Sequence, residues 1–312
     1  MAKISVIGAG AVGASTAYAL MIQGIAREVV LFDIDQAKAR AEVLDLAHGS
    51  PFTPATELSG GSDISLTEGS DLIIVTAGAK QRPGQSRLDL AGVNVSILQS
   101  LIPELLAQSP SAILMLVTNP CDVLAVVAQR ISGLPSSRVF SSGTVLDTSR
   151  LRWMLSKRLG VAASSVHAYI LGEHGDSEFS LWSQTRIGAI PLSSWDLGHG
   201  EHLEEAELDR IAFEVKNAAY QVIEGKGATN YAIGLSAARI ASAILSDENA
   251  VLTVSSVLDD YMGISGVALS VPSIVNRSGV SRVLEFPMSS TEREKFEKSA
   301  AAVANSLASL GF

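Results

Sequence analysis

Lys3-Ile4-Ser5-Val6-Ile7-Gly8-Ala9-Gly10-Ala11-Val12-Gly13 lies at the start of the chain and decides its fold. Residues 4–7 are a short apolar run typical of a buried strand, and residues 14–23 predict a helix. The three glycines between them form the pattern G-x-G-x-x-G. In a strand–turn–helix unit, the first glycine makes the tight turn and the second lets the backbone approach a pyrophosphate. The third glycine lets the helix pack closely on the strand.

A second apolar run, residues 29–32, ends at Asp33, about 20 residues after the last glycine. An acid at the end of this strand accepts hydrogen bonds from the ribose hydroxyls of a dinucleotide and repels a 2′-phosphate. The pattern therefore predicts NAD, rather than NADP, as the cofactor. Chance placement of glycines is the alternative. The strand before them, the helix after them and the acid at this distance argue against it.

The composition favours a soluble enzyme with a large core. The 312 residues are 47% hydrophobic and carry a net charge of -9, which argues against nucleic acid and anionic membrane surfaces as partners. No apolar run approaches the length of a spanning helix and no signal peptide precedes the first strand, so we expect a cytoplasmic protein. The single Cys121 excludes an intramolecular disulfide and a cysteine-built metal site, and we predict no metal.

Strand-like apolar runs alternate with helical stretches through the first half of the chain, which predicts a parallel sheet wound on both faces. The strand-like runs are 4–7, 29–32, 72–76, 113–117 and 138–140, and the helical stretches include 36–48 and 92–108. After about residue 143 the pattern changes to mixed α and β. The predicted helices there are 147–159, 203–224, 228–245 and 290–310, and the predicted strands are 166–171, 185–190, 250–258, 267–275 and 280–285.

We therefore predict an α/β chain with two domains. Residues 1–143 form the NAD-binding domain of Rossmann type, and residues 144–312 form a mixed α+β catalytic domain. The active site is expected between them, at the carboxyl ends of the first domain's strands.

The segment Gly172-Glu173-His174-Gly175-Asp176 follows an apolar run, where a strand delivers side chains to the edge of a cleft. Histidine can take and give a proton near neutral pH. A carboxylate such as Asp147 would fix its tautomer and stabilise the imidazolium, and Arg150 could clamp a substrate carboxylate through two hydrogen bonds. The three residues predict proton transfer on a small anionic substrate.

Two loops of the first half could contribute to the same site. Residues 78–87 are polar and carry three cations, so they form either a solvated surface loop or a lid that brings Arg87 to the reacting carbonyl. Asn119, which precedes a proline after a strand, is either a turn residue or an amide aimed at the nicotinamide or the substrate oxygen.

On these residues the chain resembles the L-lactate/L-malate dehydrogenase family along essentially its whole length, and within it the bacterial L-lactate dehydrogenases. Several motifs appear in the order and spacing of that family. They are Gly8–Gly13, Gln81-Arg82-Pro83-Gly84, Arg87-Leu88-Asp89-Leu90, Thr118-Asn119-Pro120, Ser142-Gly143-Thr144-Val145-Leu146-Asp147, Arg150, Gly172–Asp176 and Lys226-Gly227-Ala228-Thr229.

The resemblance implies a role for each candidate residue. His174 would be the acid/base, Asp147 would orient it, Arg150 would grip the substrate carboxylate and Arg87 would polarise the ketone. The substrate-binding residues would be Gln81, Arg87, Asn119, Arg150 and Thr229. The NAD-binding residues would be Gly8, Gly10, Val12, Gly13, Asp33, Asn119, Ser142 and Ile233.

Gln81 separates two substrates within the resemblance. Malate dehydrogenases of this family carry an arginine there, which pairs with the second carboxylate of oxaloacetate. A neutral residue leaves that charge without a partner, so pyruvate and L-lactate are favoured and oxaloacetate is the alternative. A non-catalytic NAD-binding redox sensor and a purely structural subunit are further alternatives, but neither needs the acid/base residues.

Arg152 and His167 could be an ordinary surface charge and a satisfied polar residue. In the resemblance they match positions that bind fructose 1,6-bisphosphate in activated bacterial lactate dehydrogenases. Cations from two subunits would repel across an interface until the bisphosphate neutralises them. The resemblance therefore implies a homotetramer with this sugar bisphosphate as an allosteric effector.

Overall fold

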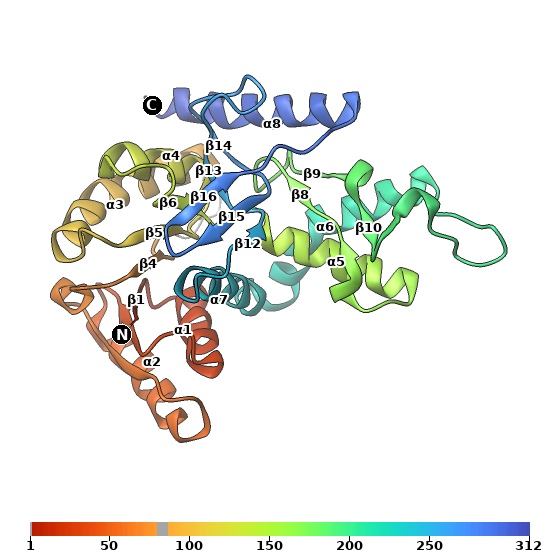
Figure 1. Ribbon diagram of the computed structural model, residues 1–312. Helices are drawn as coiled ribbons and strands as arrows, with labels where there is room; N and C mark the ends of the chain where they lie inside the picture. The colour runs from red at the N-terminus through yellow and green to blue at the C-terminus, as the bar shows by residue number, and fades with distance from the viewer. Residues whose placement is uncertain (1, 80–86) are drawn as a thin grey trace.

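The computed structural model describes residues 2–79 and 87–312, with the side chains of 87–89 left aside. Its centre is an eight-stranded sheet in the order β14-β13-β6-β5-β4-β1-β2-β3 (Figure 1). The strands from β3 to β6 run parallel, β13 pairs antiparallel with β6, and β14 pairs antiparallel with β13. The strands are β1 (Lys3–Ile7), β2 (Glu28–Phe32), β3 (Glu57–Gly61), β4 (Leu72–Val75), β5 (Ile113–Leu116), β6 (Val139–Ser141), β13 (Ser255–Val257) and β14 (Ala268–Ser270).

Helices cover both faces of this sheet because its strands bury alternate side chains on opposite sides. In β4, Ile73 and Val75 pack towards α3 (Arg87–Gln108) and α4 (Cys121–Ser132). Leu72 and Ile74 belong to the opposite cluster, formed with α1 (Ala11–Gln23) and α7 (Tyr231–Leu245). The remaining long helices are α2 (Gln36–His48), α5 (Val145–Leu159), α6 (Glu205–Lys226) and α8 (Ser290–Ser309). The parallel strand order 3-2-1-4-5-6 with helices on both faces confirms the predicted Rossmann arrangement.

The second half of the chain adds three small antiparallel sheets, in the orders β11-β10-β7, β12-β15-β16 and β8-β9. Their strands are β7 (Val166–His167), β8 (Ile170–Leu171), β9 (Phe179–Ser180), β10 (Arg186–Ile187), β11 (Ile190–Pro191), β12 (Ala250–Leu252), β15 (Ser273–Asn276) and β16 (Gly279–Val283). Short 3-10 helices lie at Ser50–Phe52, Ile64–Thr67, Ala163–Ser165, Trp182–Gln184 and Leu192–Ser194. Helices α5 and α6 enclose a separate apolar cluster that includes Leu151, Leu155, Ile211 and Val215. The mixed α+β character of this half is confirmed.

Four strand predictions were wrong in detail, and one of them, 185–190, is a hairpin of β10 and β11 rather than one strand. The segment 250–258 is not one strand, because β12 and β13 belong to different sheets and the buried Val254 lies at the crossing between them. The segment 267–275 is divided in the same way into β14 and β15, and 166–171 into β7 and β8. Strand β3 was not predicted at all, because Glu57-Leu58-Ser59-Gly60-Gly61 has little apolar character at the edge of the sheet.

One helix also departs from the sequence expectation. By length and composition, Leu90–Gln108 of α3 could cross a membrane, contrary to the expectation that no run approaches that length. In the structure Leu98, Ile102 and Leu105 are buried in the core, and α3 packs along α4. Helix α3 therefore packs one apolar face on the core, as helices at the surface of globular proteins do.

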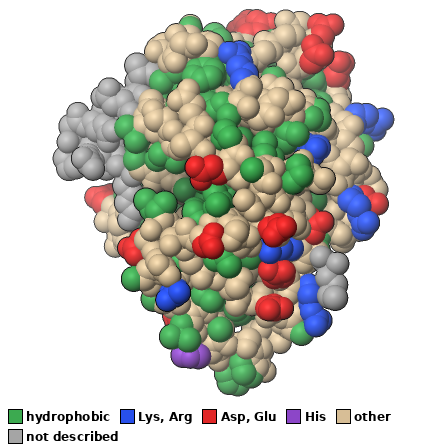
Figure 2. Space-filling view, turned by 90° about the vertical axis from the view of Figure 1, so that its left-hand side faces the viewer, with side chains coloured by type: hydrophobic (Ala, Val, Ile, Leu, Met, Phe, Trp, Pro, Cys, Tyr) green, Lys and Arg blue, Asp and Glu red, His purple; other side chains and the backbone are tan. Residues whose placement is uncertain are grey.

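The surface carries charges of both signs. On the face shown in Figure 2, acidic and basic side chains are interspersed among apolar ones. The excess of 32 acidic over 23 basic residues gives the chain its negative balance.

Candidate active site

The glycine turn at the end of β1 is as tight as the sequence predicts. Gly8 has a φ of +105°, and a Cβ there would lie 2.8 Å from the backbone nitrogen of Ala77. A Cβ on Gly13 would lie 1.8 Å from the carbonyl oxygen of Gly8. Both positions therefore exclude a side chain, and α1 begins directly against the strand turn.

The start of α1 fits the pyrophosphate of a dinucleotide. Gly10 is the N-cap residue and offers no side chain to the first N–H groups of the helix, and Val12 lies in that first turn. A Cβ on Gly10 would meet nothing within 4 Å, so the space beside this turn is open. Free N–H groups at a helix start bind anions.

Asp33 follows β2 beside this turn. Its carboxylate accepts hydrogen bonds from the backbone nitrogens of Ala9, at 2.6 Å, and Asp35, at 2.9 Å. A carboxylate has about four acceptor positions, so capacity remains for ribose hydroxyls. The residues present therefore fit NAD at the positions predicted for it.

His174, Asp147 and Arg150 form one connected group. His174 Nδ1 lies 2.6 Å from Asp147 Oδ2, and Arg150 Nη1 donates to Asp147 Oδ1 at 2.6 Å. Asp147 and Arg150 are three residues apart in the first turns of α5, so they share one face of the helix. The Asp147 side chain is 2% exposed and that of His174 is 26% exposed. With Nδ1 engaged, Nε2 is the nitrogen available to a substrate.

The electrostatics of this group favour a charged histidine. Attraction to Asp147, opposed by burial, raises the pKa of His174 to about 9. Burial disfavours the charged form of Asp147, but the positive charges of His174 and Arg150 outweigh it and hold the pKa of Asp147 below its usual value. An imidazolium next to a carboxylate is the proton donor that ketone reduction requires.

The backbone around His174 is fixed by three different elements. Gly172 forms a bridge with Ser270 of β14, and the backbone nitrogen of Glu173 donates to Ser299 Oγ of α8 at 2.6 Å. The backbone nitrogen of His174 donates to Asp122 Oδ2 of α4 at 2.7 Å. These bonds fix the position of the loop, so little further conformational entropy is lost when the imidazole contacts Asp147.

Two acids of this site were missed from sequence. Asp122 is buried, and burial raises its pKa to about 6. Glu178 is 8% exposed, and one of its oxygens lies within 4.8 Å of both a ring nitrogen of His174 and a carboxylate oxygen of Asp147. Glu178 could have been noticed, since it lies four residues after His174.

The remaining substrate- and cofactor-side candidates follow the carboxyl ends of the strands or lie in the second half. Asn119 is exposed after β5, and Ser142 is buried after β6. Thr229 lies between α6 and α7, and Ile233 packs against the core from α7. Gln81 lies outside the described residues, as does the side chain of Arg87.

The two candidate effector residues lie on neighbouring segments. Arg152 of α5 donates from Nε to the carbonyl oxygen of Ala168 at 3.0 Å, and its guanidinium lies over the ring of Tyr169 at 5.2 Å. Burial lowers the pKa of Arg152. His167, next to Ala168 on β7, is exposed.

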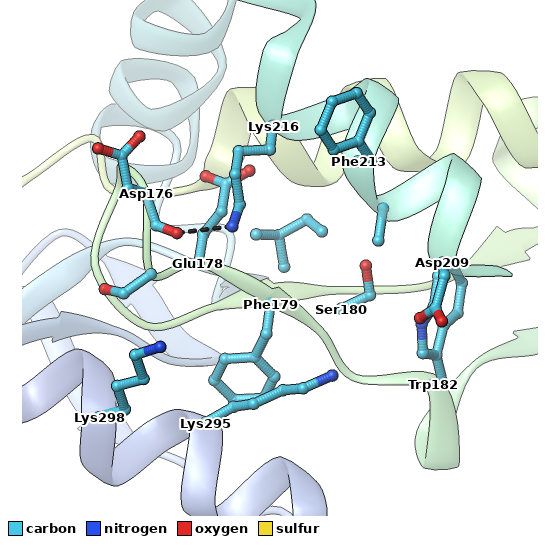
Figure 3. Close-up of a pocket in the computed structure, with 13 residues that line it drawn as sticks. Asp176, Glu178, Phe179, Ser180, Trp182, Asp209, Phe213, Lys216, Lys295 and Lys298 are labelled. Atoms are coloured by element: carbon cyan, nitrogen blue, oxygen red, sulfur yellow. Dashed lines mark hydrogen bonds between the residues drawn. The ribbon is translucent and has the colours of Figure 1, made fainter. Parts of the chain in front are cut away.

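A cavity of about 310 Å³ lies beside the catalytic group, between β9, α6 and α8 (Figure 3). Glu178 forms part of its wall, so the cavity reaches the acid that neighbours His174 and Asp147. Lys216 of α6 donates to the carbonyl oxygen of Asp176 at 2.6 Å. Lys295 and Lys298 of α8 lie on the opposite side.

Comparison with known proteins gives two family matches that together span nearly the whole chain. The family model described as lactate/malate dehydrogenase, NAD binding domain, matches residues 2–141. The model described as lactate/malate dehydrogenase, alpha/beta C-terminal domain, matches residues 144–310.

Individual relatives agree with the family models. The chain is 48% identical over 312 residues to an L-lactate dehydrogenase of Bifidobacterium animalis subsp. lactis, covering 99% of this chain and 97% of the relative. A crystal structure of a minor L-lactate dehydrogenase from Enterococcus mundtii in a ligand-bound form superposes with a TM-score of 0.95 at 40% identity, covering 99% and 98%. A lactate dehydrogenase from a Medee basin deep-sea metagenome library also gives 0.95, at 36% identity, covering 100% and 99%.

Proposed function

The chain belongs to the lactate/malate dehydrogenase family, and from this premise we propose that it interconverts pyruvate and L-lactate as an L-lactate dehydrogenase. It is an NAD-dependent oxidoreductase. The observation that carries the proposal is the connected group in which Asp147 holds both His174 and Arg150 at 2.6 Å. The group therefore contains a proton donor, His174, and a cation that can bind a carboxylate, Arg150, on the same aspartate.

In the proposed reaction, bound NADH supplies the hydride, and the protein supplies position, charge and a proton. His174 donates the proton on Nε2 to the carbonyl oxygen of pyruvate. Asp147 stabilises the imidazolium before this transfer and keeps the ring oriented after it. Arg150 uses one of its five N–H donors on Asp147, so others remain to bind the substrate carboxylate. Oxidation of lactate uses the same residues with His174 neutral.

The choice of pyruvate over oxaloacetate rests on Gln81 and on the names of the relatives. A neutral side chain at Gln81 gives a second substrate carboxylate no cationic partner, and an unpaired charge in a closed site costs several kcal/mol, on the order of 3 or more. The relatives compared above are named as lactate dehydrogenases.

The test is kcat/KM for pyruvate and for oxaloacetate with NADH, in the wild type and in Gln81→Arg. We expect the wild type to prefer pyruvate, and we expect Gln81→Arg to move the ratio toward oxaloacetate by roughly 100-fold, because charged hydrogen bonds are strong. Gln99→Arg on the exposed side of α3 adds the same charge elsewhere and should leave the ratio unchanged. A wild type that prefers oxaloacetate would replace lactate with malate as the product.

We also propose that fructose 1,6-bisphosphate activates the enzyme through Arg152 and His167. The half-buried guanidinium of Arg152, whose pKa burial lowers, would gain from an anionic partner. Pyruvate saturation curves with and without the bisphosphate test this, in the wild type and in Arg152→Gln. Activation lost in Arg152→Gln supports the site, and identical curves in the wild type refute it.

We further propose that the protein is a homotetramer in the cytoplasm. Large apolar side chains are exposed on α1, α6 and α7, and such surfaces are typical of subunit contacts. They include Tyr18, Ile22, Phe213, Ile223, Tyr231 and Leu235. Sedimentation equilibrium of the purified chain gives its mass directly, and a monomeric mass would refute the assembly.

A further inference from the structure

The proposed mechanism assigns no role to Glu178, a buried acid of the active site. Glu178 is 8% exposed, and one of its oxygens lies within 4.8 Å of the His174–Asp147 pair. Among the described residues its carboxyl group makes no direct ion pair. Asp147, by contrast, has two partners at 2.6 Å.

Two carboxyl groups this close in a buried setting do not both ionise easily. Asp147 is the one that keeps its charge, because Arg150 and His174 bind it directly. Burial, followed by the charge of Asp147, raises the pKa of Glu178 to about 8, while His174, Arg150 and Lys216 act in the opposite direction. Glu178 is therefore the group that changes its charge just above neutral pH.

We propose that Glu178 is a positioning residue that sets the pH at which His174 gives up its proton. This inference rests on the proposed function of His174 as the acid/base. Glu178 is neutral at physiological pH, and on losing its proton it becomes a second anion beside the imidazolium. That anion keeps His174 charged over a wider alkaline range.

The other charged groups around Glu178 come from each element packed against it. Asp122 on α4 ionises at lower pH, with a pKa of about 6, so its charge is already constant above neutrality. The full set is Asp122, Asp147, Arg150, Glu173, His174, Asp176, Asp209, Lys216, Lys295 and Lys298.

The cavity of Figure 3 gives Glu178 its own route for proton exchange. Glu178 forms part of the cavity wall together with Ser180, Lys216 and Lys298. Its proton can exchange with solvent on this side.

The test is the pH profile of kcat/KM for pyruvate in the wild type and in Glu178→Gln. Glutamine keeps the size of the side chain and stays neutral, so the alkaline fall in activity should shift to lower pH by about one unit. Activity well below pH 8 should change little. Asp209→Asn removes a charge from the far side of the same cavity and should leave the profile in place. Coincident profiles for the wild type and Glu178→Gln would overturn the proposal.

A second measurement requires no substrate. Diethyl pyrocarbonate reacts with neutral imidazole, so the pH dependence of its reaction at His174, followed by peptide mass spectrometry, reports the pKa of that histidine. We expect this pKa to fall in Glu178→Gln, and an unchanged value would overturn the proposal. A wild type inactive on pyruvate that still showed this shift would refute the proposed substrate but not the role of Glu178.

Discussion

His174 illustrates how one residue's chemistry depends on its neighbours. A histidine in water is mostly neutral at neutral pH, but the pKa of His174 is raised to about 9 by Asp147. The imidazolium, which donates the proton to the ketone in the proposed reaction, is therefore favoured at neutral pH. Under the proposed function, the site therefore holds the proton that pyruvate reduction consumes.

Replacing His174 with asparagine should abolish turnover while preserving cofactor binding. Asparagine cannot donate or accept a proton in this way, so we expect kcat to fall by about 10²–10⁴-fold or more. NADH binding, followed by fluorescence titration, should be unchanged because Gly10 and Asp33 are untouched. Turnover within tenfold of the wild type would remove His174 from its role.

The same residues show where sequence-based prediction works and where it stops. His174, Asp147 and Arg150 were predicted because their side-chain types suit proton transfer and the binding of a substrate carboxylate. Asp122 was not, because its function is to hold a backbone nitrogen 52 positions away. Glu178 was not, because the proton affinity of an acid depends on burial that the local sequence does not display.

At the scale of elements, the turn between β1 and α1 combines two requirements on its glycines. Gly13 is needed for packing, since a Cβ there would overlap the carbonyl oxygen of Gly8. Gly10 has room for a Cβ and a φ of -73°, so the fold alone does not require a glycine there. Under the proposed function, the open space beside Gly10 receives the pyrophosphate of NAD.

Alanine at these two positions should therefore give opposite results. Gly13→Ala should destabilise the protein by about 1–3 kcal/mol or more through overpacking, seen as a lower urea midpoint. Gly10→Ala should keep the midpoint and weaken NADH binding, because the new methyl group occupies ligand space. Equal NADH affinity in Gly10→Ala and the wild type would place the pyrophosphate elsewhere.

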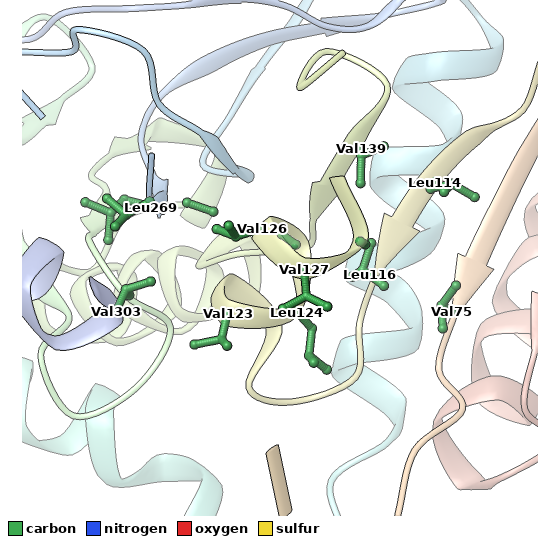
Figure 4. Close-up of a cluster of buried hydrophobic side chains, with 14 of the residues drawn as sticks. Val75, Leu114, Leu116, Val123, Leu124, Val126, Val127, Val139, Leu269 and Val303 are labelled. Carbon is green, nitrogen blue, oxygen red and sulfur yellow. The ribbon is translucent and has the colours of Figure 1, made fainter. Parts of the chain in front are cut away.

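Element prediction succeeded where burial is continuous and failed where the chain changes sheets. The five strands predicted for the first half are short, apolar and buried. The segment 250–258 also has a largely apolar sequence, but its two ends pair with strands of different sheets and form β12 and β13. The local sequence does not show these pairing partners. The side chains of helix α4 are buried between the sheet and α8 (Figure 4). This packing fixes the position of Asp122, which binds the backbone of the loop that carries His174.

At the scale of the whole molecule, the two halves of the chain meet in one sheet. Strands β13 and β14, from the second half, extend the parallel sheet beyond β6. The bridge between Ser270 of β14 and Gly172 then connects this sheet to the catalytic loop. The cofactor turn and the acid/base group are consequently positioned by the same sheet, which limits their relative movement.

The stability of the whole protein should fall as the pH rises from about 6 to about 9. The folded-state pKa values of Asp122, Glu178 and His174 are raised to about 6, 8 and 9. The folded protein therefore binds more protons than the unfolded chain in this range, and its stability decreases with pH.

Urea unfolding midpoints measured between pH 5 and 10 test this slope. Glu178→Gln should flatten the decline near pH 8, because glutamine does not titrate, whereas Asp209→Asn should follow the wild type. Below about pH 4.5 the direction reverses. The pKa of Glu292, which accepts hydrogen bonds from Ser183 and Ser289, is lowered despite burial, so its contribution is lost on acidification. A wild-type midpoint that rises between pH 6 and 9 would contradict the charge states assigned to the active site, because all three groups act in the same direction there.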